Sequence, residues 1–229
     1  MPKPKAIAIV SGGLDSVTLA YKLAAEGYRL HLLSFDYGQR HRREIEGAEA
    51  AAAALGADFD RIDLSGIKRL LHGSALTDDR IAVPHGHYAA PTMAATVVPN
   101  RNAMMLAIAF AVAVAEGALV VATGVHAGDH FVYPDCRPGF VEAFDAMQVQ
   151  AVEGFGHPNL RLVAPFVHST KAEIVAEGHR LGVPFAATWS CYEGGDRHCG
   201  RCGTCVERIE AFALAGVADP TPYEEIAHV

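Results

Sequence analysis

A hexapeptide near the amino terminus, Ser11-Gly12-Gly13-Leu14-Asp15-Ser16, has the residue types of an anion-binding loop. Two glycines allow a tight turn that exposes backbone N–H groups, and the two serine hydroxyls add further donors. Asp15 would repel a bound phosphate unless a divalent cation lay between them, so we interpret it as a Mg²⁺-linked residue. An ordinary glycine turn in which Asp15 caps a helix is the alternative. The loop matches neither GxxxxGK[ST] nor GxGxxG, which disfavours γ-phosphate kinases and dinucleotide oxidoreductases.

Four of the five cysteines lie close together near the carboxyl terminus, at Cys191, Cys199, Cys202 and Cys205. Glycines between the later ligands let the chain wrap a small ion, and four thiolates suit a structural tetrahedral Zn²⁺. An iron–sulfur cluster is the competing occupant, because Cys-x2-Cys-x2-Cys is also a cluster spacing. We favour zinc, since the chemistry inferred for the loop needs no redox centre. The charges between the cysteines are mixed, which indicates a structural clip rather than a nucleic-acid module.

The elements that must position these residues can be predicted from hydrophobic periodicity. The apolar run 5–10 predicts a buried strand, and helical spacing over 15–26 predicts a helix that Gly27 ends. Further strands are expected near 30–35, 58–63, 118–124 and 160–165, and helices near 42–55, 101–116, 138–150 and 171–181. Thr170 and Glu173 have capping-box spacing for the helix at 171–181. The stretch 72–99 is long enough to predict a functional loop or lid.

Strands that alternate with helices in this way predict a doubly wound, mostly parallel five-stranded α/β sheet covered on both faces. The net charge of -7 argues against non-specific binding to nucleic acid, because a phosphate backbone favours basic faces. No apolar run is long enough to span a bilayer, and Met1 to Lys5 contains no export signal. We therefore expect a cytoplasmic protein, in a compartment reducing enough for the cysteines to bind a metal.

Five motifs together carry a resemblance to a known family. The SGGLDS loop after a first strand resembles the PP-loop of the N-type ATP pyrophosphatases. The other motifs are Asp36–His41, Val98–Asn102, Tyr133–Pro138 and Thr188–Tyr192. In combination they resemble the 7-cyano-7-deazaguanine synthase family of queuosine biosynthesis, also known as the ExsB family. The likeness runs from Ser11 to Asp219-Pro220, and Asn100 departs from it where many members have a small residue.

The resemblance implies an adenine nucleotide alpha hydrolase-like fold, with a PP-loop ATP pyrophosphatase domain at 1–185. Residues 186–229 would form a zinc-binding segment and a helix packed on the same domain. The implied enzyme is a carbon–nitrogen ligase that converts 7-carboxy-7-deazaguanine, ammonia and ATP to 7-cyano-7-deazaguanine, through adenylates of the carboxylate and then of the amide. The implied cofactors are ATP, Mg²⁺ and Zn²⁺, and the implied assembly is a homodimer that binds neither nucleic acid nor a membrane.

Alternative functions are a PP-loop enzyme that adenylates a tRNA base, a paralogue acting on another carboxylated substrate, and a non-catalytic zinc-binding regulator. A basic arm or a cysteine pair outside the zinc cluster would favour the first, and neither is evident.

The resemblance also implies roles for individual residues. The expected nucleotide-binding residues are Val10, Ser11, Gly12, Gly13, Leu14, Asp15, Ser16, Val17, Phe35 and Tyr37. The expected catalytic residues are Asp15, Arg101, Asp129 and Lys171, and the substrate pocket is assigned to Arg101, Asn102, Tyr133, Asp135 and Arg137. An exposed arginine at a helix start and a surface lysine are the alternatives for Arg101 and Lys171. We expect Cys136 to be a pocket or core thiol rather than a nucleophile.

Overall fold

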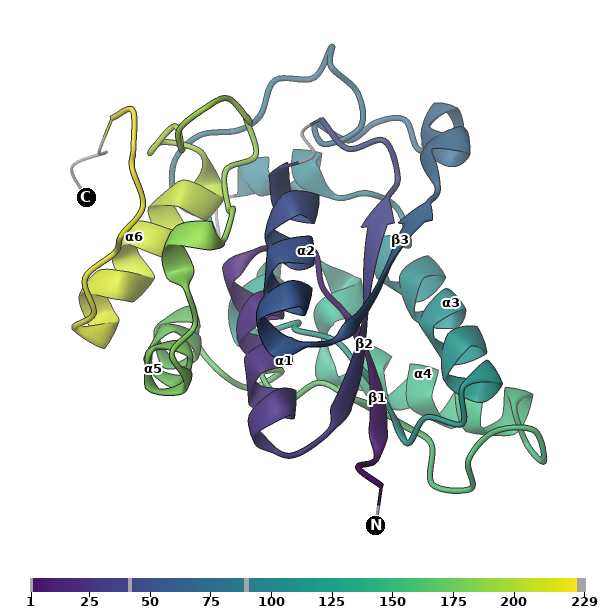
Figure 1. The fold of residues 1–229 in the computed structure, drawn as a ribbon. Helices are drawn as coiled ribbons and strands as arrows, with labels where there is room; N and C mark the ends of the chain where they lie inside the picture. Colours follow the sequence, from purple (N-terminus) through teal and green to yellow (C-terminus); the bar gives the residue numbers. More distant parts are fainter. Residues whose placement is uncertain (1, 41–42, 89–90, 226–229) are drawn as a thin grey trace.

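The computed structural model describes residues 2–40, 43–88 and 91–225. Within them, five parallel strands form one sheet in the order β3-β2-β1-β4-β5 (Figure 1). The strands are β1 (Lys5–Ile9), β2 (Arg29–Asp36), β3 (Asp58–Asp63), β4 (Val120–Ala122) and β5 (Arg161–Val163). The predicted doubly wound five-stranded sheet is confirmed.

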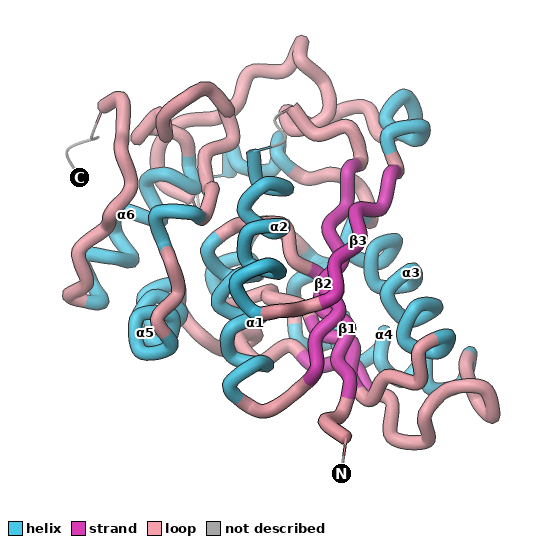
Figure 2. Tube along the Cα trace, in the orientation of Figure 1, coloured by secondary structure: helices cyan, strands magenta, loops and turns pink. Residues whose placement is uncertain are grey.

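Six α-helices of the described chain cover the two faces of the sheet (Figures 1 and 2). On one face lie α1 (Leu14–Ala25), α2 (Arg43–Leu55), α5 (Lys171–Leu181) and α6 (Gly203–Ala215). On the other lie α3 (Arg101–Ala115) and α4 (Pro138–Ala151). Short 3-10 helices occur at Ser65–Leu70, Pro91–Thr96, Ala127–Phe131, Pro134–Cys136 and Phe185–Ala187. Each face buries its own apolar cluster, so the sheet has a core on both sides.

The strand order reverses beside β1, which pairs with β2 on one side and with β4 on the other. In open α/β sheets the crevice at such a switch point, outside the carboxyl ends of the strands, is where ligands bind. The segments that follow β1, β2 and β4 all leave the sheet at this end. They carry the residues for which the sequence predicts chemistry.

Every predicted strand and helix is present, with differences at the ends. The run 118–124 yields only Val120–Ala122 as strand, because its pairing with β5 covers three residues. The capping box of α5 is confirmed: Thr170 Oγ1 accepts from Glu173 N at 3.3 Å, and Glu173 Oε2 accepts from Thr170 N at 2.7 Å. No described helix is both long and apolar enough to cross a bilayer.

Helix α6, in the carboxyl-terminal segment, packs on α5 (Figure 1). Phe212 of α6 meets Phe185 edge to face, with ring centroids 5.0 Å apart. Arg208 is fully buried and donates to Phe185 O at 3.0 Å and to Thr188 Oγ1 at 2.8 Å. Asp219 lies 3.3 Å from its guanidinium, so this buried cation is paired.

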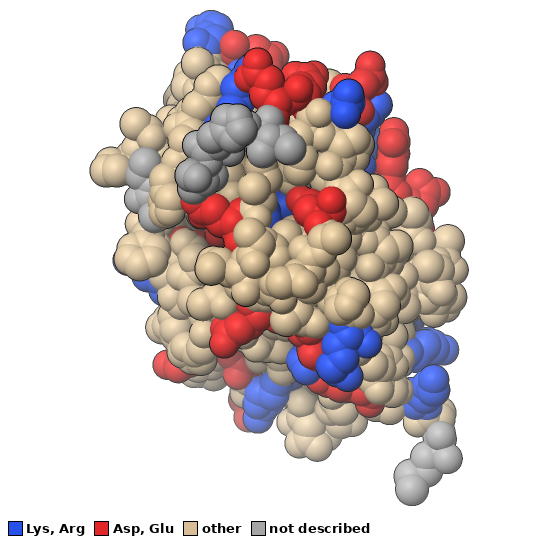
Figure 3. Space-filling view, turned by 90° about the vertical axis from the view of Figure 1, so that its left-hand side faces the viewer, with Lys and Arg blue, Asp and Glu red and all other residues tan. Residues whose placement is uncertain are grey.

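The face in Figure 3 carries both acidic and basic side chains among mostly uncharged residues.

Candidate nucleotide and substrate site

The Ser11–Ser16 loop connects β1 to α1 and is held in shape by its own hydroxyls. Ser11 Oγ accepts from Gly13 N at 3.2 Å, and Ser16 Oγ accepts from Ser11 N at 3.2 Å. The N-cap of α1 is Gly13, which makes no side-chain cap bond, and Asp15 lies inside the first turn. The alternative in which Asp15 caps the helix is therefore wrong.

Only glycine fits at position 12, because of the backbone conformation there and the atoms close to it. Its φ is +98°, and a Cβ built on it would lie 1.7 Å from the carbonyl oxygen of Glu44. Any side chain at this position would collide with the backbone of α2. The close approach also brings the start of α2 directly against the loop.

Lys171, the first residue of α5, extends into a buried group of acids beside the loop. Its Nζ lies 2.6 Å from Asp15 Oδ2 and 3.1 Å from Glu207 Oε2. The side chain is 14% exposed, so the surface-lysine alternative is wrong. Burial alone would lower the pKa of Lys171, but Asp15, Glu207 and Asp129 outweigh it and raise that pKa above the ordinary value. Lys171 is thus an ammonium group.

Asp15 retains an oxygen that could hold a cation. Burial opposes its ionisation, but Lys171 and His126 outweigh this effect and lower the pKa of Asp15. Its Oδ1 is buried and has no hydrogen-bond partner within the described ranges. His126 Nε2 lies 3.8 Å from Asp15 Oδ2 and 3.5 Å from Asp129 Oδ1, which puts both carboxylates around one imidazole. With Glu207, three acids face one lysine, and this donor set fits a divalent cation such as Mg²⁺.

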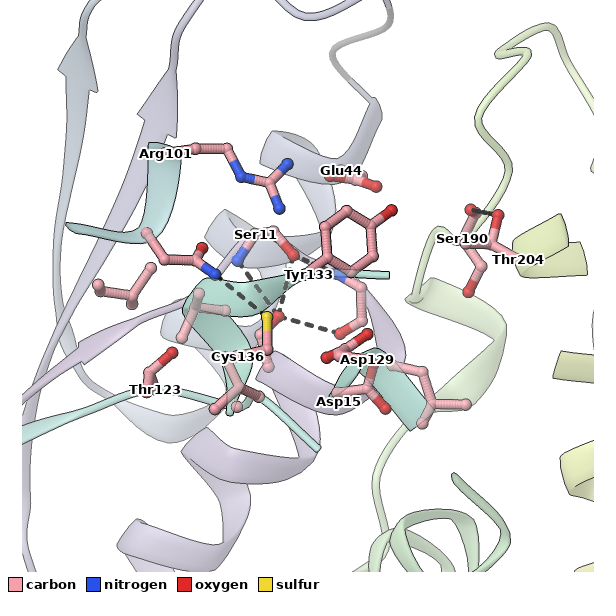
Figure 4. A pocket seen from close by; sticks show the side chains of 18 of the residues that line it. Ser11, Asp15, Glu44, Arg101, Thr123, Asp129, Tyr133, Cys136, Ser190 and Thr204 are labelled. Atoms are coloured by element: carbon pink, nitrogen blue, oxygen red, sulfur yellow. Dashed lines mark hydrogen bonds between the residues drawn. The ribbon is translucent and has the colours of Figure 1, made fainter. Parts of the chain in front are cut away.

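A cavity of about 220 Å³ runs from the loop across the carboxyl ends of the strands (Figure 4). The predicted residues that line it are Val10, Ser11, Gly13, Leu14, Asp15, Ser16, Phe35, Tyr37, Arg101, Asn102, Asp129, Tyr133 and Lys171. Gly12 is the loop residue that lies against α2, and Val17 is buried on the side of α1 that faces the core. His41, from one of the motifs, lies outside the described residues.

Arg101 opens α3 and points into the cavity. Its Nη1 donates to Tyr37 Oη at 3.1 Å, and the guanidinium lies 5.6 Å from the Tyr37 ring centroid. The alternative of an exposed arginine is therefore wrong, and the planar donor fork remains available to a carboxylate or phosphate. Asn100, the N-cap of α3, has a φ of +55°, a left-handed conformation that asparagine tolerates better than most residues.

Some residues of the Tyr133–Arg137 segment line the cavity, and others hold neighbouring backbone in place. Tyr133 is buried and shares a 2.5 Å hydrogen bond with Thr96 Oγ1, and Cys136 lines the cavity beside it. Burial raises the pKa of the Cys136 thiol, which fits a pocket thiol rather than a nucleophile. Asp135 Oδ2 instead accepts from the backbone N of Asn102 at 3.2 Å, and Arg137 donates to His130 O at 2.9 Å. Neither Asp135 nor Arg137 is among the described cavity-lining residues.

The four clustered cysteines form a compact, fully buried group. Their Sγ atoms all lie within 4.8 Å of one another, and Cys199 Sγ is 3.9 Å from Cys205 Sγ. Thiolates at about 2.3 Å from a tetrahedral Zn²⁺ would be about 3.8 Å apart, so the spacing fits. Backbone N–H groups of Cys199 and Cys202 also point at the sulfurs of Cys191 and Cys199, at 3.4 and 3.3 Å. The cluster is compatible with zinc.

Several cavity residues had no predicted role. Trp189, Ser190, Tyr192 and Thr204 lie before or between the cysteines, and they form one wall of the cavity. Thr204 Oγ1 donates to Ser190 O at 2.7 Å and ties the two parts of this wall together. The first three belong to the Thr188–Tyr192 motif, so the sequence did mark this segment. Their place in the cavity wall could not be predicted, because it depends on the path of the chain through the cysteine cluster.

Glu44, Tyr88 and Glu207 were also missed. Glu44 and Tyr88 line the cavity, and Glu207 reaches Lys171 from α6. No local spacing in the sequence distinguishes any of the three from a surface residue.

The parallel sheet, the glycine loop at its switch point and the lysine facing that loop define an α/β protein of the PP-loop class. Residues 5–216 match the family model described as "Queuosine biosynthesis protein QueC", and the chain belongs to this family.

Relatives at high identity carry one name. A "7-cyano-7-deazaguanine synthase" of Ruegeria pomeroyi is 63% identical over 96% of this chain and 95% of the relative. A protein of the same name from Brucella ovis is 62% identical over 96% of this chain and 94% of its own length. Among solved structures, the NH3-dependent NAD synthetase of Campylobacter jejuni superposes with a TM-score of 0.47 and 12% identity. That match covers 80% of this chain and 66% of the other, and it says nothing of what this chain binds.

Proposed function

We propose that this chain is an ATP-dependent ligase that converts 7-carboxy-7-deazaguanine and ammonia into 7-cyano-7-deazaguanine. Family membership and the names of its relatives support the choice of substrate. The observation that carries the proposal is the continuity of the site. The glycine loop, Lys171 and the aromatic side chains of Tyr37 and Tyr133 line one cavity, so nucleotide phosphates and a flat bicyclic base can meet there.

The first half of the reaction converts a carboxylate into an amide. A carboxylate is a poor electrophile because oxide is a poor leaving group. Its oxygen therefore attacks the α-phosphorus of ATP, pyrophosphate leaves, and the resulting acyl adenylate can expel AMP. Attack by ammonia forms the C–N bond as the C–O bond to AMP breaks.

The second half meets the same obstacle, because the amide oxygen is an equally poor leaving group. A second ATP adenylates that oxygen with release of pyrophosphate. Loss of AMP and of both protons on nitrogen then gives the C≡N bond. One nucleotide site can serve both halves, which agrees with a chain that has a single glycine loop.

Each group in the cavity has a physical reason for its proposed role. The N–H groups and hydroxyls of the loop would bind the departing pyrophosphate at the amino end of α1. Lys171, already an ammonium beside Asp15, would exchange that carboxylate for phosphate oxygens. Asp15 and Asp129 would hold Mg²⁺, which neutralises phosphate charge when it is bound. Arg101 would orient a carboxylate or phosphate through its planar fork.

We assign the four cysteines to a structural Zn²⁺ that fixes the cavity wall from Trp189 to Thr204. A closed set of four thiolates leaves no coordination site for substrate, so zinc would act on folding rather than on chemistry. A homodimer, a cytoplasmic location, a moving 72–99 lid and the absence of nucleic-acid binding stay predictions.

The direct test incubates the purified protein with 7-carboxy-7-deazaguanine, ammonium and MgATP, and follows the nitrile and the nucleotide products. We expect nitrile together with AMP and pyrophosphate, and no AMP when the deazaguanine is omitted. AMP formation that requires tRNA instead would favour an enzyme that modifies a tRNA base. The release of ADP and phosphate would exclude adenylation altogether.

A further inference from the structure

Glu44 is an acidic side chain in the cavity to which the steps above give no role. It lies in the first turn of α2, and its backbone oxygen is the atom that Gly12 approaches so closely. Its carboxyl group lines the cavity and is half-buried. Figure 4 shows it on the same side of the cavity as Arg101, with Asp15 and Asp129 on the other side.

The other cavity acids are already engaged. Asp15 is paired with Lys171 at 2.6 Å, and Asp129 accepts from Tyr88 Oη at 3.1 Å and from His126 N at 3.3 Å. Glu44 makes neither a hydrogen bond nor an ion pair with any described residue, and Arg101 is the charged group that acts on it through space. A half-buried carboxyl group with no partner among the residues that the structure describes points to a ligand, because burying an unpaired carboxylate is costly.

The pKa of Glu44 suits the exchange of a proton with a ligand near neutral pH. Burial raises its pKa to about 7, against an opposing effect of the Arg101 guanidinium. The charge of Glu44 also contributes to raising the pKa of the Tyr37 phenol, and Arg101 opposes it. Glu44, Arg101 and Tyr37 therefore interact electrostatically with one another. A carboxyl group in this range can both take up and release a proton during turnover.

The proposed reaction has an unmet need for such a group. Ammonia is mostly ammonium in neutral water, and ammonium has no lone pair with which to attack an acyl adenylate. An enzyme that takes ammonium from solution must bind the cation and remove a proton from it close to the reacting carbon. The Asp15 carboxylate cannot do this while it is neutralised by Lys171 or by a metal ion.

We propose that the Glu44 carboxylate binds ammonium beside the glycine loop and is the general base that converts it to ammonia. The inference rests on the proposed function and adds a catalytic residue to it. Glu44 takes one proton from ammonium, and the lone pair so released forms the C–N bond to the acyl carbon. The C–O bond to AMP breaks with its electron pair on the AMP oxygen. That oxygen accepts the second proton lost from nitrogen, and Glu44 later returns its own proton to solvent.

The two halves of the reaction allow this role to be tested in isolation, because only the first consumes ammonium. In Glu44→Gln, kcat/KM for ammonium should fall about 100-fold or more, the usual effect of losing a general base. Conversion of the synthetic amide to nitrile should stay within about threefold of wild type, as should exchange of pyrophosphate into ATP driven by the carboxylated substrate. Glu46→Gln, an exposed change on the same helix, should leave all three rates unchanged.

Hydroxylamine gives a second readout, because it is a free base at neutral pH and needs no deprotonation before attack. Glu44→Gln should form the hydroxamate from the acyl adenylate at close to the wild-type rate. The inference is overturned if hydroxylamine and ammonium are impaired alike, if the amide reaction falls together with the ammonium reaction, or if ammonium use is unchanged. If wild-type protein shows no pyrophosphate exchange with the carboxylated substrate, the proposed function itself fails, whatever Glu44 does.

Discussion

At the scale of single residues, the site contains both ion-paired and unpaired polar atoms among its described residues. Lys171 lies between Asp15 and Glu207, so its burial is offset by two carboxylates. Asp15 gives only one of its oxygens to this pairing. A lysine that transfers from Asp15 to a phosphate would stay paired with an anion, and a metal ion bound by Asp15 would replace it as the partner of that carboxylate. Each of these buried charges would then keep a partner of opposite sign.

We predict that Asp15→Asn folds but loses activity. Lys171 keeps Glu207 as its partner, so thermal unfolding should change little. Turnover should fall about 100-fold or more, because the charge proposed to hold Mg²⁺ is lost. Steady-state rates should be measured against Mg²⁺ concentration, with Glu26→Gln at the far end of α1 as the control. Wild-type turnover at limiting Mg²⁺ would refute the role given to Asp15.

The pH dependence of the free energy of unfolding should include a contribution from Glu44. Its pKa is about 7 in the folded protein and 4.5 for an ordinary glutamate, so the folded state binds more protons between these values. Folding is therefore favoured at low pH and loses free energy as the pH rises from 4.5 to 7, by linkage. Glu44→Gln removes this loss and should gain about 1–2 kcal/mol relative to wild type on going from pH 5 to pH 8.

Urea unfolding at both pH values measures this gain, and Glu46→Gln should follow wild type at each. Parallel pH dependences for Glu44→Gln and wild type would mean that the Glu44 carboxyl group is fully solvated.

At the scale of elements, the cavity is assembled from segments far apart in the chain. The loop after β1 supplies phosphate donors, the starts of α2 and α3 supply Glu44 and Arg101, and α5 supplies Lys171. The cysteine segment closes the remaining side and is itself fixed by buried Arg208 on α6. The same helix follows directly after Cys202, contains Cys205 and places Glu207 beside Lys171. Loss of the zinc proposed for this cluster should therefore disturb both folding and the site.

Metal analysis of the purified protein should find about one zinc per chain. The double variant Cys202→Ser, Cys205→Ser should lose that zinc and much of its soluble expression, because metal binding contributes folding free energy. Cys136→Ser is the matched control, since this cysteine lies in the cavity and not in the cluster, and it should keep its zinc. An iron chromophore in the wild-type protein, or full zinc occupancy in the double variant, would contradict the assignment.

At the scale of the whole molecule, the sequence predicted the sheet well because its signals are local. Alternating apolar strands, helix periodicity and the Thr170–Glu173 capping box each depend on neighbours within a few residues. The glycine loop and the cysteine cluster were predictable for the same reason, as their ligands are close in sequence.

Other features of the site depend on contacts between segments that are distant in sequence. Asp135 was expected in the pocket but binds the backbone of Asn102, and nothing near it in sequence indicates this. Glu44 and Glu207 were overlooked because the cations that act on them come from other elements: Arg101 affects Glu44 through space, and Lys171 forms an ion pair with Glu207. Burial and charge pairing of this kind are set by tertiary packing, which residue spacing does not encode.

The central claim, that one site performs two successive adenylations, is tested most directly by counting products. With the carboxylated deazaguanine, ammonium and ATP, the account predicts two AMP and two pyrophosphate for each nitrile. With the synthetic amide and ATP, and no added ammonium, it predicts one of each. If the amide is inert, or if one AMP accompanies each nitrile from the carboxylate, the two-step sequence in a single site is contradicted.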